Sequence, residues 1–340
     1  MPYFTRGRKA DVIRKYNEKL ATAAEDFLAL WEKDDCPRKS VRDFTVTRRL
    51  ASGAFGVVYG AEHGGIAYAM KVQPKFDSFE IPKKEKRMQW ALKNMFVVEL
   101  FYCYVSHTDV FLFMDLAPYG NLNAMEPFPL SDAKTKLMLS QVVRGLEYIH
   151  KCGIIYRDLK PDNVLIFEKG LLKISDFGLS VFKGSCPRDH LGTPQYMAPE
   201  MFLRKQYDNA VDWWAFGIMM YELLTESRAT PFHPPYTSAA DFARCTTDAP
   251  PAGLDDPRYT PAAKSMMLQF LVKDPKQRLG SGGCEAVMEH AWFSDINFDT
   301  LIVEEEFPHI ELPPEREAVE GDFSNFNMER PNEDPEWQAF

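Results

Sequence analysis

The sequence lacks a hydrophobic run long enough to cross a bilayer. Its longest apolar stretch runs only from Ala215 to Tyr221, whereas a spanning helix needs about 20 such residues. It also lacks the basic and apolar segments of a secretory leader near its start. Pro2 follows Met1, so the glycine that N-myristoylation requires is missing. These absences predict a protein of the cytoplasm or nucleus with no membrane span and no N-myristoyl signal.

Cysteine is scarce and scattered along the chain. The six cysteines stand at positions 36, 103, 152, 186, 245 and 284. They form neither a Cys-x-x-Cys pair nor any other metal-like spacing, which argues against a zinc site and against a disulfide framework. Reduced thiols, as in cytosolic or nuclear proteins, are the expectation.

Basic residues are nearly absent from residues 301–340. Twelve acids stand there against Arg316 and Arg330, a balance of −10, so the net charge of −9 leaves about +1 for the rest. No basic segment indicates a nucleic-acid partner. Aromatic residues interleave with the acids, and a purely solvated tail has little use for such rings. We therefore expect the tail to dock on the rest of the chain.

A carboxylate, an ammonium and a carboxamide stand at fixed offsets in Tyr156-Arg157-Asp158-Leu159-Lys160-Pro161-Asp162-Asn163. In the catalytic loop of protein kinases an Asp accepts the proton of the substrate hydroxyl. A Lys two residues later stabilises the transferred phosphoryl group, and an Asn five residues after the Asp holds magnesium. Asp158, Lys160 and Asn163 match these offsets.

Further motifs follow in the order that a kinase requires. Asp176-Phe177-Gly178 comes after a short strand-like segment, and Asp176 is expected to be the main magnesium ligand. Gly192-Thr193-Pro194 and Ala198-Pro199-Glu200 close an activation segment in which Thr193 should bond near the catalytic Asp. Arg278 is the expected buried partner of Glu200. A single motif could be a polar turn, but five in register indicate a kinase.

The order of strand and helix patterns predicts an α+β, bilobal protein kinase fold. Residues 1–40 form an extension with one amphipathic helix of about five turns from Ile13 to Trp31. Residues 44–293 form the kinase domain, with a small β-rich lobe at 44–114, a hinge at 115–121 and a larger helical lobe at 122–293. Residues 294–340 form the acidic tail.

The small lobe and hinge carry the residues expected to bind ATP. Lys71 should hold the α- and β-phosphates and pair with Glu85 of a short following helix. Ala51 stands where the first glycine of the phosphate-binding loop is usual. The remaining candidates are the loop residues Gly53, Phe55 and Gly56, the adenine-lining Leu50, Val58, Ala69 and Leu165, the gatekeeper Met114, and Asp115, Ala117 and Asn121 of the hinge.

Several features resemble the AGC branch of protein kinases, above all the cAMP-dependent kinase catalytic subunits. They are Tyr156 in place of the usual His, Asp212-Trp213-Trp214-Ala215-Phe216-Gly217, Leu279-Gly280 after Arg278, and the aromatic tail. The resemblance extends from Phe27 to Phe340 and implies ATP and Mg²⁺ as cofactors and protein Ser/Thr as substrate. It also implies that Phe326 caps adenine, and that Trp337 and Phe340 fill a pocket on the small lobe.

The sequence departs from this branch in its activation segment and at one subunit contact. Asp189 stands where an activating phosphothreonine is usual, so we expect it to pair with Arg157 and to order the segment without phosphate. Arg188 replaces the Trp that grips a cAMP-binding regulatory subunit, which argues against control by that subunit.

The acids expected to read substrate arginines also differ from this branch. Asn121 stands where an acid is usual, while Asp162 and Glu222 remain, so a relaxed preference for basic residues before the phosphoacceptor is expected. His190, Pro194 and Met197 should line the pocket for the residue after the phosphoacceptor.

Two other functions fit parts of the pattern. A pseudokinase acting as an interaction scaffold is suggested by Ala51, by the short helix around Glu85 and by Gln89, which stands where an aliphatic residue is usual. A small-molecule kinase on the same fold is disfavoured, because the segment from Gly192 to Glu200 is of the peptide-docking type. Phosphate transfer to a Ser/Thr peptide would separate these possibilities.

Overall fold

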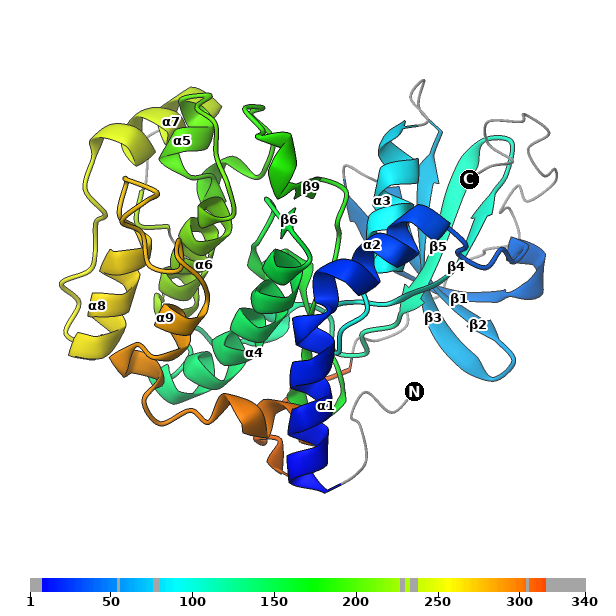
Figure 1. Ribbon diagram of the computed structural model, residues 1–340, viewed down its shortest axis with the longest axis horizontal. Coiled ribbons are helices and arrows are strands. Elements are labelled where there is room, and N and C mark those ends of the chain that lie inside the picture. The colour runs from blue at the N-terminus through cyan, green and yellow to red at the C-terminus, as the bar shows by residue number, and fades with distance from the viewer. Residues whose placement is uncertain are drawn as a thin grey trace.

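The computed structural model describes residues 8–53, 56–75, 80–226, 230–232, 238–303 and 306–315. A five-stranded antiparallel sheet with one helix, α3 (Glu80–Ala91), forms the small lobe, and a larger helical lobe follows (Figure 1). The sheet order is β1-β2-β3-β5-β4, with β1 Thr45–Gly53, β2 Gly56–His63, β3 Ile66–Pro74, β4 Leu100–Val105 and β5 Asp109–Asp115. The predicted α+β, two-lobed fold is confirmed.

The small-lobe sheet packs a separate aromatic cluster on the face away from α3. Phe44 stacks on Phe113 with ring centroids 3.8 Å apart, and Tyr68 meets Phe44 edge to face. Strand β4 was missed in the sequence, because Leu100–Val105 has no polar alternation that would mark a half-buried strand. It adds the outer strand next to β5.

The helical lobe is built around α6 (Ala210–Leu224), every residue of which is buried. A helix that is apolar all round belongs in the middle of a domain, which explains the uninterrupted apolar run at its centre. Other described elements of this lobe are α4 Asp132–Lys151, α5 Pro199–Phe202, α7 Ala239–Asp248, α8 Pro261–Phe270 and α9 Glu285–Met288, with the short strand pairs β6 Ile154–Ile155 with β9 Val181–Phe182 and β7 Val164–Ile166 with β8 Leu172–Ile174.

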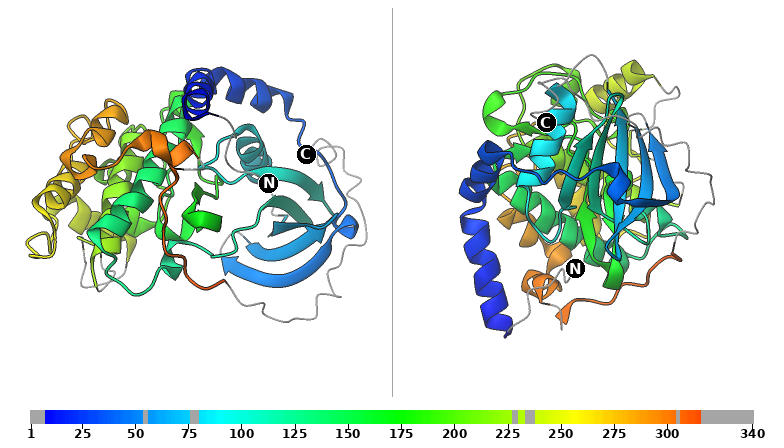
Figure 2. Two further views of the ribbon diagram at one scale, coloured as in Figure 1. Left: turned by 90° about the horizontal axis from the view of Figure 1, so that it is seen from below. Right: turned by 90° about the vertical axis from the view of Figure 1, so that its right-hand side faces the viewer.

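The N-terminal extension forms two helices, α1 (Lys9–Ala21) and α2 (Ala23–Lys33), so the prediction of one continuous helix is wrong. The chain bends at Thr22, whose hydroxyl donates to Asp26 Oδ2 at 2.7 Å. The bend has a packing reason: α1 and α2 both contact α4, and the turn lets α2 also lay its aromatic residues against α3 and Phe182 (Figure 2).

The described part of the tail runs from the helical lobe toward the small lobe (Figure 2). Ile310 packs so closely on Gly170 that a Cβ on this glycine would lie 2.7 Å from it. Phe326, Trp337 and Phe340 lie outside the described residues, so their expected docking stays a prediction. Among the helices of the described ranges, none has the length and apolar character to traverse a membrane.

Candidate active site

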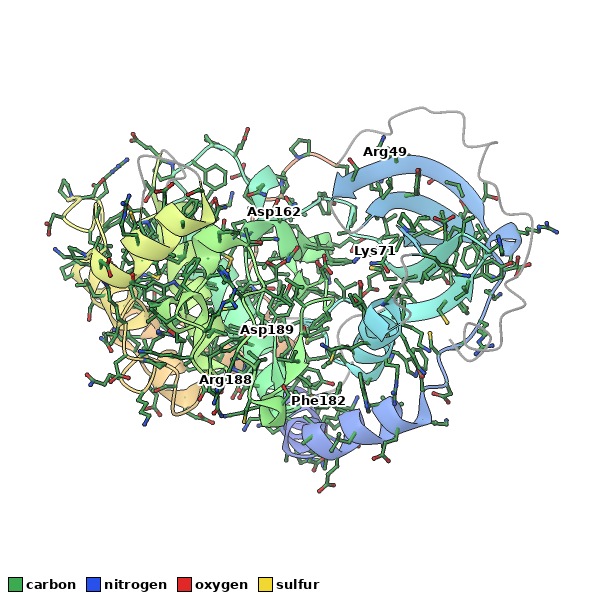
Figure 3. The ribbon with its side chains drawn as sticks, turned by 90° about the horizontal axis from the view of Figure 1, so that it is seen from above. Arg49, Lys71, Asp162, Phe182, Arg188 and Asp189 are labelled. Atoms are coloured by element: carbon green, nitrogen blue, oxygen red, sulfur yellow. The ribbon has the colours of Figure 1, made fainter. Side chains whose placement is uncertain are left out.

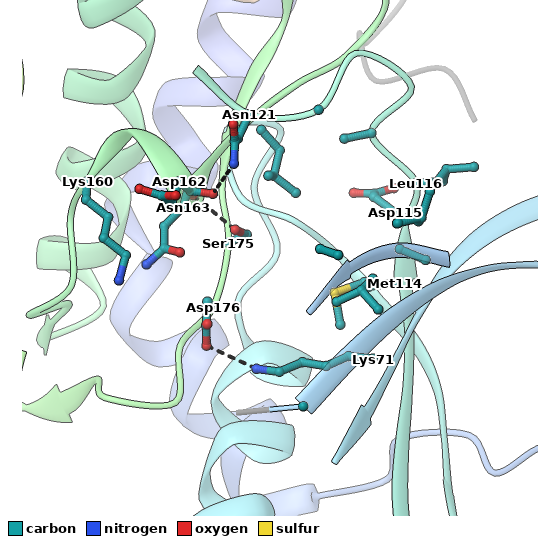
Figure 4. Close-up of a pocket in the computed structure, with 18 of the residues that line it drawn as sticks. Lys71, Met114, Asp115, Leu116, Asn121, Lys160, Asp162, Asn163, Ser175 and Asp176 are labelled. Carbon is teal, nitrogen blue, oxygen red and sulfur yellow. Dashed lines mark hydrogen bonds and ion pairs between the residues drawn. The ribbon is translucent and has the colours of Figure 1, made fainter. Parts of the chain in front are cut away.

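A cleft of about 500 Å³ opens between the two lobes (Figure 4). The residues expected to bind nucleotide converge on it from both sides: Leu50, Gly56, Val58, Ala69, Lys71, Glu85, Met114, Asp115, Ala117, Asn121 and Leu165. Gly53 pairs with Gly56 where β1 and β2 meet, and Phe55 lies outside the described residues. Apolar side chains therefore line the hinge end of the cleft, and charged ones line the other end.

Gly56 has a backbone that only glycine adopts readily. Its φ is +130°, and a Cβ there would lie 2.1 Å from the carbonyl oxygen of Val72 on the neighbouring strand. The missing side chain allows the start of β2 to lie this close to its paired strand β3 beside the cleft.

Lys71 projects from β3 into the cleft and meets two carboxylates. Its Nζ lies 2.6 Å from Glu85 Oε1 and 3.2 Å from Asp176 Oδ1 (Figure 4). Burial alone would lower the pKa of Lys71, but the charges of Glu85 and Asp176 raise it above the usual value. The ammonium is therefore fixed and charged before any anion enters.

The predicted catalytic loop brings four polar side chains together. Asp158 Oδ2 accepts from Lys160 Nζ and from Asn163 Nδ2, each at 2.9 Å, and its Oδ1 accepts from the Thr193 hydroxyl at 2.7 Å. Lys160 also donates to Thr193 Oγ1 at 2.7 Å. The activation segment and the catalytic loop are thus joined at the Asp158 carboxylate, as the sequence predicted.

Asp212 of α6 holds this loop from below, a contact that motif reasoning did not assign. Its buried carboxylate accepts from the backbone N–H groups of Tyr156 at 3.0 Å and Arg157 at 2.8 Å. Arg157 has φ +75°, a left-handed conformation that costs about 1–3 kcal/mol for a residue with a side chain. The two bonds to Asp212 offset that strain and fix the backbone directly before Asp158, whose carboxylate contacts Lys160, Asn163 and Thr193 of the cleft wall.

The donor chemistry at the inner end of the cleft suits a hard cation. Asp176, at φ +59°, and the Asn163 amide both line the cleft, and they lie near each other on the side that faces Lys71 (Figure 4). Mg²⁺ is usually held by one or two protein oxygens together with substrate phosphates and water. Asn163 and Asp176 therefore fit a magnesium ion that arrives with a nucleotide.

The comparison with known proteins decides the family. The family described as "Protein kinase domain" matches residues 44–293. The chain belongs to the protein kinase family. This kinase is 31% identical over 312 residues to cAMP-dependent protein kinase type 3 of Saccharomyces cerevisiae, covering 87% of the chain and 75% of the relative.

Two further relatives differ in how much of them the kinase spans. A cAMP-dependent protein kinase catalytic subunit of Arthrobotrys oligospora is 30% identical over 331 residues, or 92% of the chain and 62% of the relative. Protein kinase C-like 2 of Schizosaccharomyces pombe is 35% identical over 280 residues, or 78% of the chain and 27% of the relative. The chain thus spans less than two thirds of these two relatives. It is a divergent AGC kinase, as predicted, and a serine/threonine protein kinase by class.

The activation segment of the kinase is tied to the catalytic loop through Asp189. Asp189 Oδ1 accepts from Arg157 NH1 at 2.6 Å and from the Tyr207 hydroxyl at 2.7 Å. Burial is the largest single influence and raises the pKa of Asp189, but the bonds from Tyr207 and Arg157 together with the Arg157 charge outweigh it, so the pKa is lowered overall. Burial raises the pKa of Tyr207 to about 12, so the phenol remains a donor.

Neither Tyr207 nor Lys84 was expected at this cluster. Burial, together with the charge of Arg157, lowers the pKa of Lys84 on α3, while Asp189 opposes that shift. A cation of α3 therefore lies within electrostatic range of Asp189. The signal for Lys84 in the sequence was weak, because charged residues at helical spacing usually belong to a solvated face.

The residues expected to contact substrate differ in accessibility. Asp162 is exposed at the mouth of the cleft, where the Asn121 amide donates to its backbone oxygen at 3.3 Å (Figures 3 and 4). Glu222 is only 6% exposed and accepts from the Tyr196 hydroxyl. His190 and Pro194 are accessible, whereas Met197 is buried beneath the segment.

Glu200 and Arg278 form the expected buried ion pair below the activation segment. Arg278 NH1 and NH2 donate to the two carboxylate oxygens at 2.6 and 3.0 Å, and NH1 also reaches the Ala210 carbonyl at 2.9 Å. Both side chains are at most 4% exposed. The end of the segment is therefore fastened to the start of α6.

Proposed function

We propose that the kinase transfers the γ-phosphoryl group of ATP, with Mg²⁺, to Ser or Thr of protein substrates with basic residues before the phosphoacceptor. The observation that carries this proposal is the set of bonds on Asp158. The Asp158 carboxylate is held by the ammonium, the amide and the hydroxyl of residues beside the cleft. A carboxylate fixed in this way can orient a substrate hydroxyl and accept its proton.

Each residue in the cleft has a distinct part in this reaction. Mg²⁺ would supply shielding of the phosphate charge when bound between Asn163 and Asp176. Asp158 accepts a hydrogen bond from the substrate hydroxyl and takes its proton. Lys160 and Lys71 place positive charge where the phosphate oxygens lie, so the acceleration comes mainly from positioning and preorganised electrostatics.

We also propose that Asp189 replaces a phosphorylated residue in ordering the activation segment. The bonds from Arg157 and Tyr207 support this role, because they join the segment to the residue beside the catalytic Asp. One carboxylate carries less charge than a phosphate at neutral pH. The segment is thus held without an upstream kinase but less firmly than by a phosphate.

Substrate selection is proposed to use Asp162 and Glu222. Asp162 is exposed and can meet a guanidinium directly, whereas an arginine that approaches Glu222 must share it with the Tyr196 hydroxyl. Arg188, beside Asp189, stands in place of the Trp that grips a cAMP-binding regulatory subunit. We therefore propose that regulation does not depend on such a subunit.

The test is γ-phosphate transfer by bacterially produced protein to Ser/Thr peptides that differ only in arginine position. We expect Asp158→Asn to reduce transfer by about 10²- to 10⁴-fold. Glu222→Gln should remove the preference for arginine two residues before the phosphoacceptor. Glu226→Gln is the matched control, because this acid follows α6 and its side chain is 69% exposed.

Absence of transfer to every peptide by the wild-type protein would refute the proposal. Binding of Mg-ATP without transfer would then favour the interaction scaffold. Transfer that Asp158→Asn leaves unchanged would point to a contaminating kinase.

A further inference from the structure

Two buried glutamines lie where helix α3 packs between β3 and the segment before β4. Gln73 of β3 is 6% exposed, and Gln89 of α3 is 1% exposed. Neither side chain carries a charge, and Gln89 lines the cleft next to Glu85. A buried amide is unfavourable unless it is hydrogen-bonded, so the bonds that these two side chains make indicate what they do.

Gln73 shares the carboxylate of Glu85 with Lys71. Along β3, residues 71 and 73 point to the same face of the sheet, and this face meets α3. Lys71 Nζ lies 2.6 Å from Glu85 Oε1, and Gln73 Nε2 donates to Glu85 Oε2 at 2.9 Å. Each carboxylate oxygen therefore has its own donor from the same strand, which fixes both the position and the rotation of the Glu85 side chain.

The second glutamine holds the other end of α3. Gln89 Nε2 donates to the Val98 carbonyl at 2.9 Å. Val98 N in turn donates to the Ile174 carbonyl at 2.9 Å. Ile174 ends β8 two residues before Asp176. Gln89 therefore links α3 to the backbone that carries Asp176.

The two bonds act on one helix at positions four residues apart, 85 and 89, which lie on the same helical face. Together they define the distance of α3 from β3 and from β8. One remaining group, Gln73 Oε1, finds no hydrogen-bond partner among the described residues. An aliphatic side chain of similar size would avoid the free-energy cost of this buried oxygen without a hydrogen bond. Packing alone therefore does not account for an amide at position 73.

We propose that Gln73 and Gln89 are positioning residues that hold α3 where Glu85 reaches Lys71. The inference rests on the proposed phosphoryl transfer, because it concerns the same Lys71–Glu85 pair. It identifies a device of this chain's own side chains that keeps the nucleotide-binding lysine in place before nucleotide binds.

The first measurement needs no catalysis. Amide hydrogen exchange of residues 80–91 is compared in the free wild-type protein, Gln73→Met and Gln89→Met. Met has a similar volume and no donor, so the fold should persist. We expect exchange of these amides to become about tenfold faster in each variant, which corresponds to about 1.4 kcal/mol. Gln269→Met, at an exposed glutamine of α8, is the matched control.

The second measurement separates positioning from packing. Loss of either amide should raise the KM for ATP by about tenfold and change kcat by less than about threefold, because Lys71 loses its fixed position more than the catalytic loop does. Calorimetric titration with Mg-ADP should give the same weakening.

A third variant, Gln73→Glu, tests the donor directly. Its carboxylate would stand where the amide now donates to Glu85 Oε2 at 2.9 Å. At about pH 8 it should repel Glu85 and weaken Mg-ADP binding more than Gln73→Met does.

Unchanged exchange of residues 80–91 in both methionine variants would overturn the proposal, as would a Gln73→Glu variant that binds Mg-ADP no more weakly than Gln73→Met at about pH 8. If one methionine variant does not fold, the other decides, since the two bonds are independent. If the wild-type protein transfers no phosphate, the proposed function fails, but the exchange and Mg-ADP results still decide whether the glutamines position α3.

Discussion

Replacement of Asp189 by Asn is the sharpest test of how the activation segment is ordered. The substitution keeps the shape of the side chain and removes the charge that faces Arg157 and Tyr207. The Arg157 guanidinium is 2% exposed and is left without this carboxylate, although it still donates to the Leu179 carbonyl at 2.6 Å.

The expected magnitude follows from the two bonds and their exposure. A hydrogen bond to a charged group contributes about 1.5–3 kcal/mol when it is buried. The Asp189 side chain is 42% exposed, so solvent screening reduces this value. About 1–2 kcal/mol remains, which is a factor of about 5–30. We therefore expect kcat/KM for a peptide to fall by about 5- to 30-fold.

The dependence on pH gives an independent check. Because the pKa of Asp189 is lowered in the folded protein, its contribution is complete above the unfolded value of about 4 and is lost as pH falls through the folded value. The ratio of wild-type to Asp189→Asn activity should therefore be constant from about pH 6 to about pH 9. Asp255→Asn, at a carboxylate that is 98% exposed, is the control. Equal kcat/KM for wild type and Asp189→Asn would refute the reasoning.

Three further substitutions test the scaffold of the site. Glu200→Gln breaks the buried pair with Arg278 and should lower stability by about 3–5 kcal/mol, seen as a Tm reduced by about 5–15 °C in a thermal melt; an unchanged Tm would contradict this. Asp212→Asn turns an NH2 donor toward one of the two backbone N–H donors, so one of the bonds that hold the catalytic loop is lost. We expect kcat to fall by about 10- to 100-fold while Mg-ADP affinity, measured by calorimetry, stays the same. Gly56→Ala forces a Cβ against the Val72 carbonyl and should weaken Mg-ADP binding by about tenfold or more, whereas wild-type affinity would show that the strand can shift.

The sequence was sufficient to predict the site residues whose roles depend on a fixed spacing along the chain. Asp158, Lys160 and Asn163 belong to one short loop, so their proximity follows from chain geometry. Lys71 and Glu85 are fourteen positions apart, and their pairing could be predicted because a strand followed by a helix leaves few arrangements.

Residues that act across the fold were harder to predict. Tyr207 and Asp212 reach the catalytic loop from about fifty residues away. Tyr207 stands in no recognised pattern, and the motif that begins at Asp212 was noted without a role for its carboxylate. Gln73 was not singled out, because one polar residue in a strand says nothing about what it faces. The break at Thr22 was missed since apolar residues keep helical spacing through it, and only the docking of α2 requires the bend.

The position of α2 means that the matched kinase domain, residues 44–293, does not include every residue that supports the site. The Trp31 ring lies 5.0 Å from the Phe182 ring and 4.3 Å from the Arg87 guanidinium of α3. The Asp34 carboxylate lies 2.8 Å from the Lys86 ammonium. A protein trimmed to residues 44–293 would expose the Phe182 ring and take the Asp34 carboxylate away from a fully buried lysine. Residues 8–40 therefore support α3 and Phe182 from within the same chain, as a separate bound subunit could do in another protein.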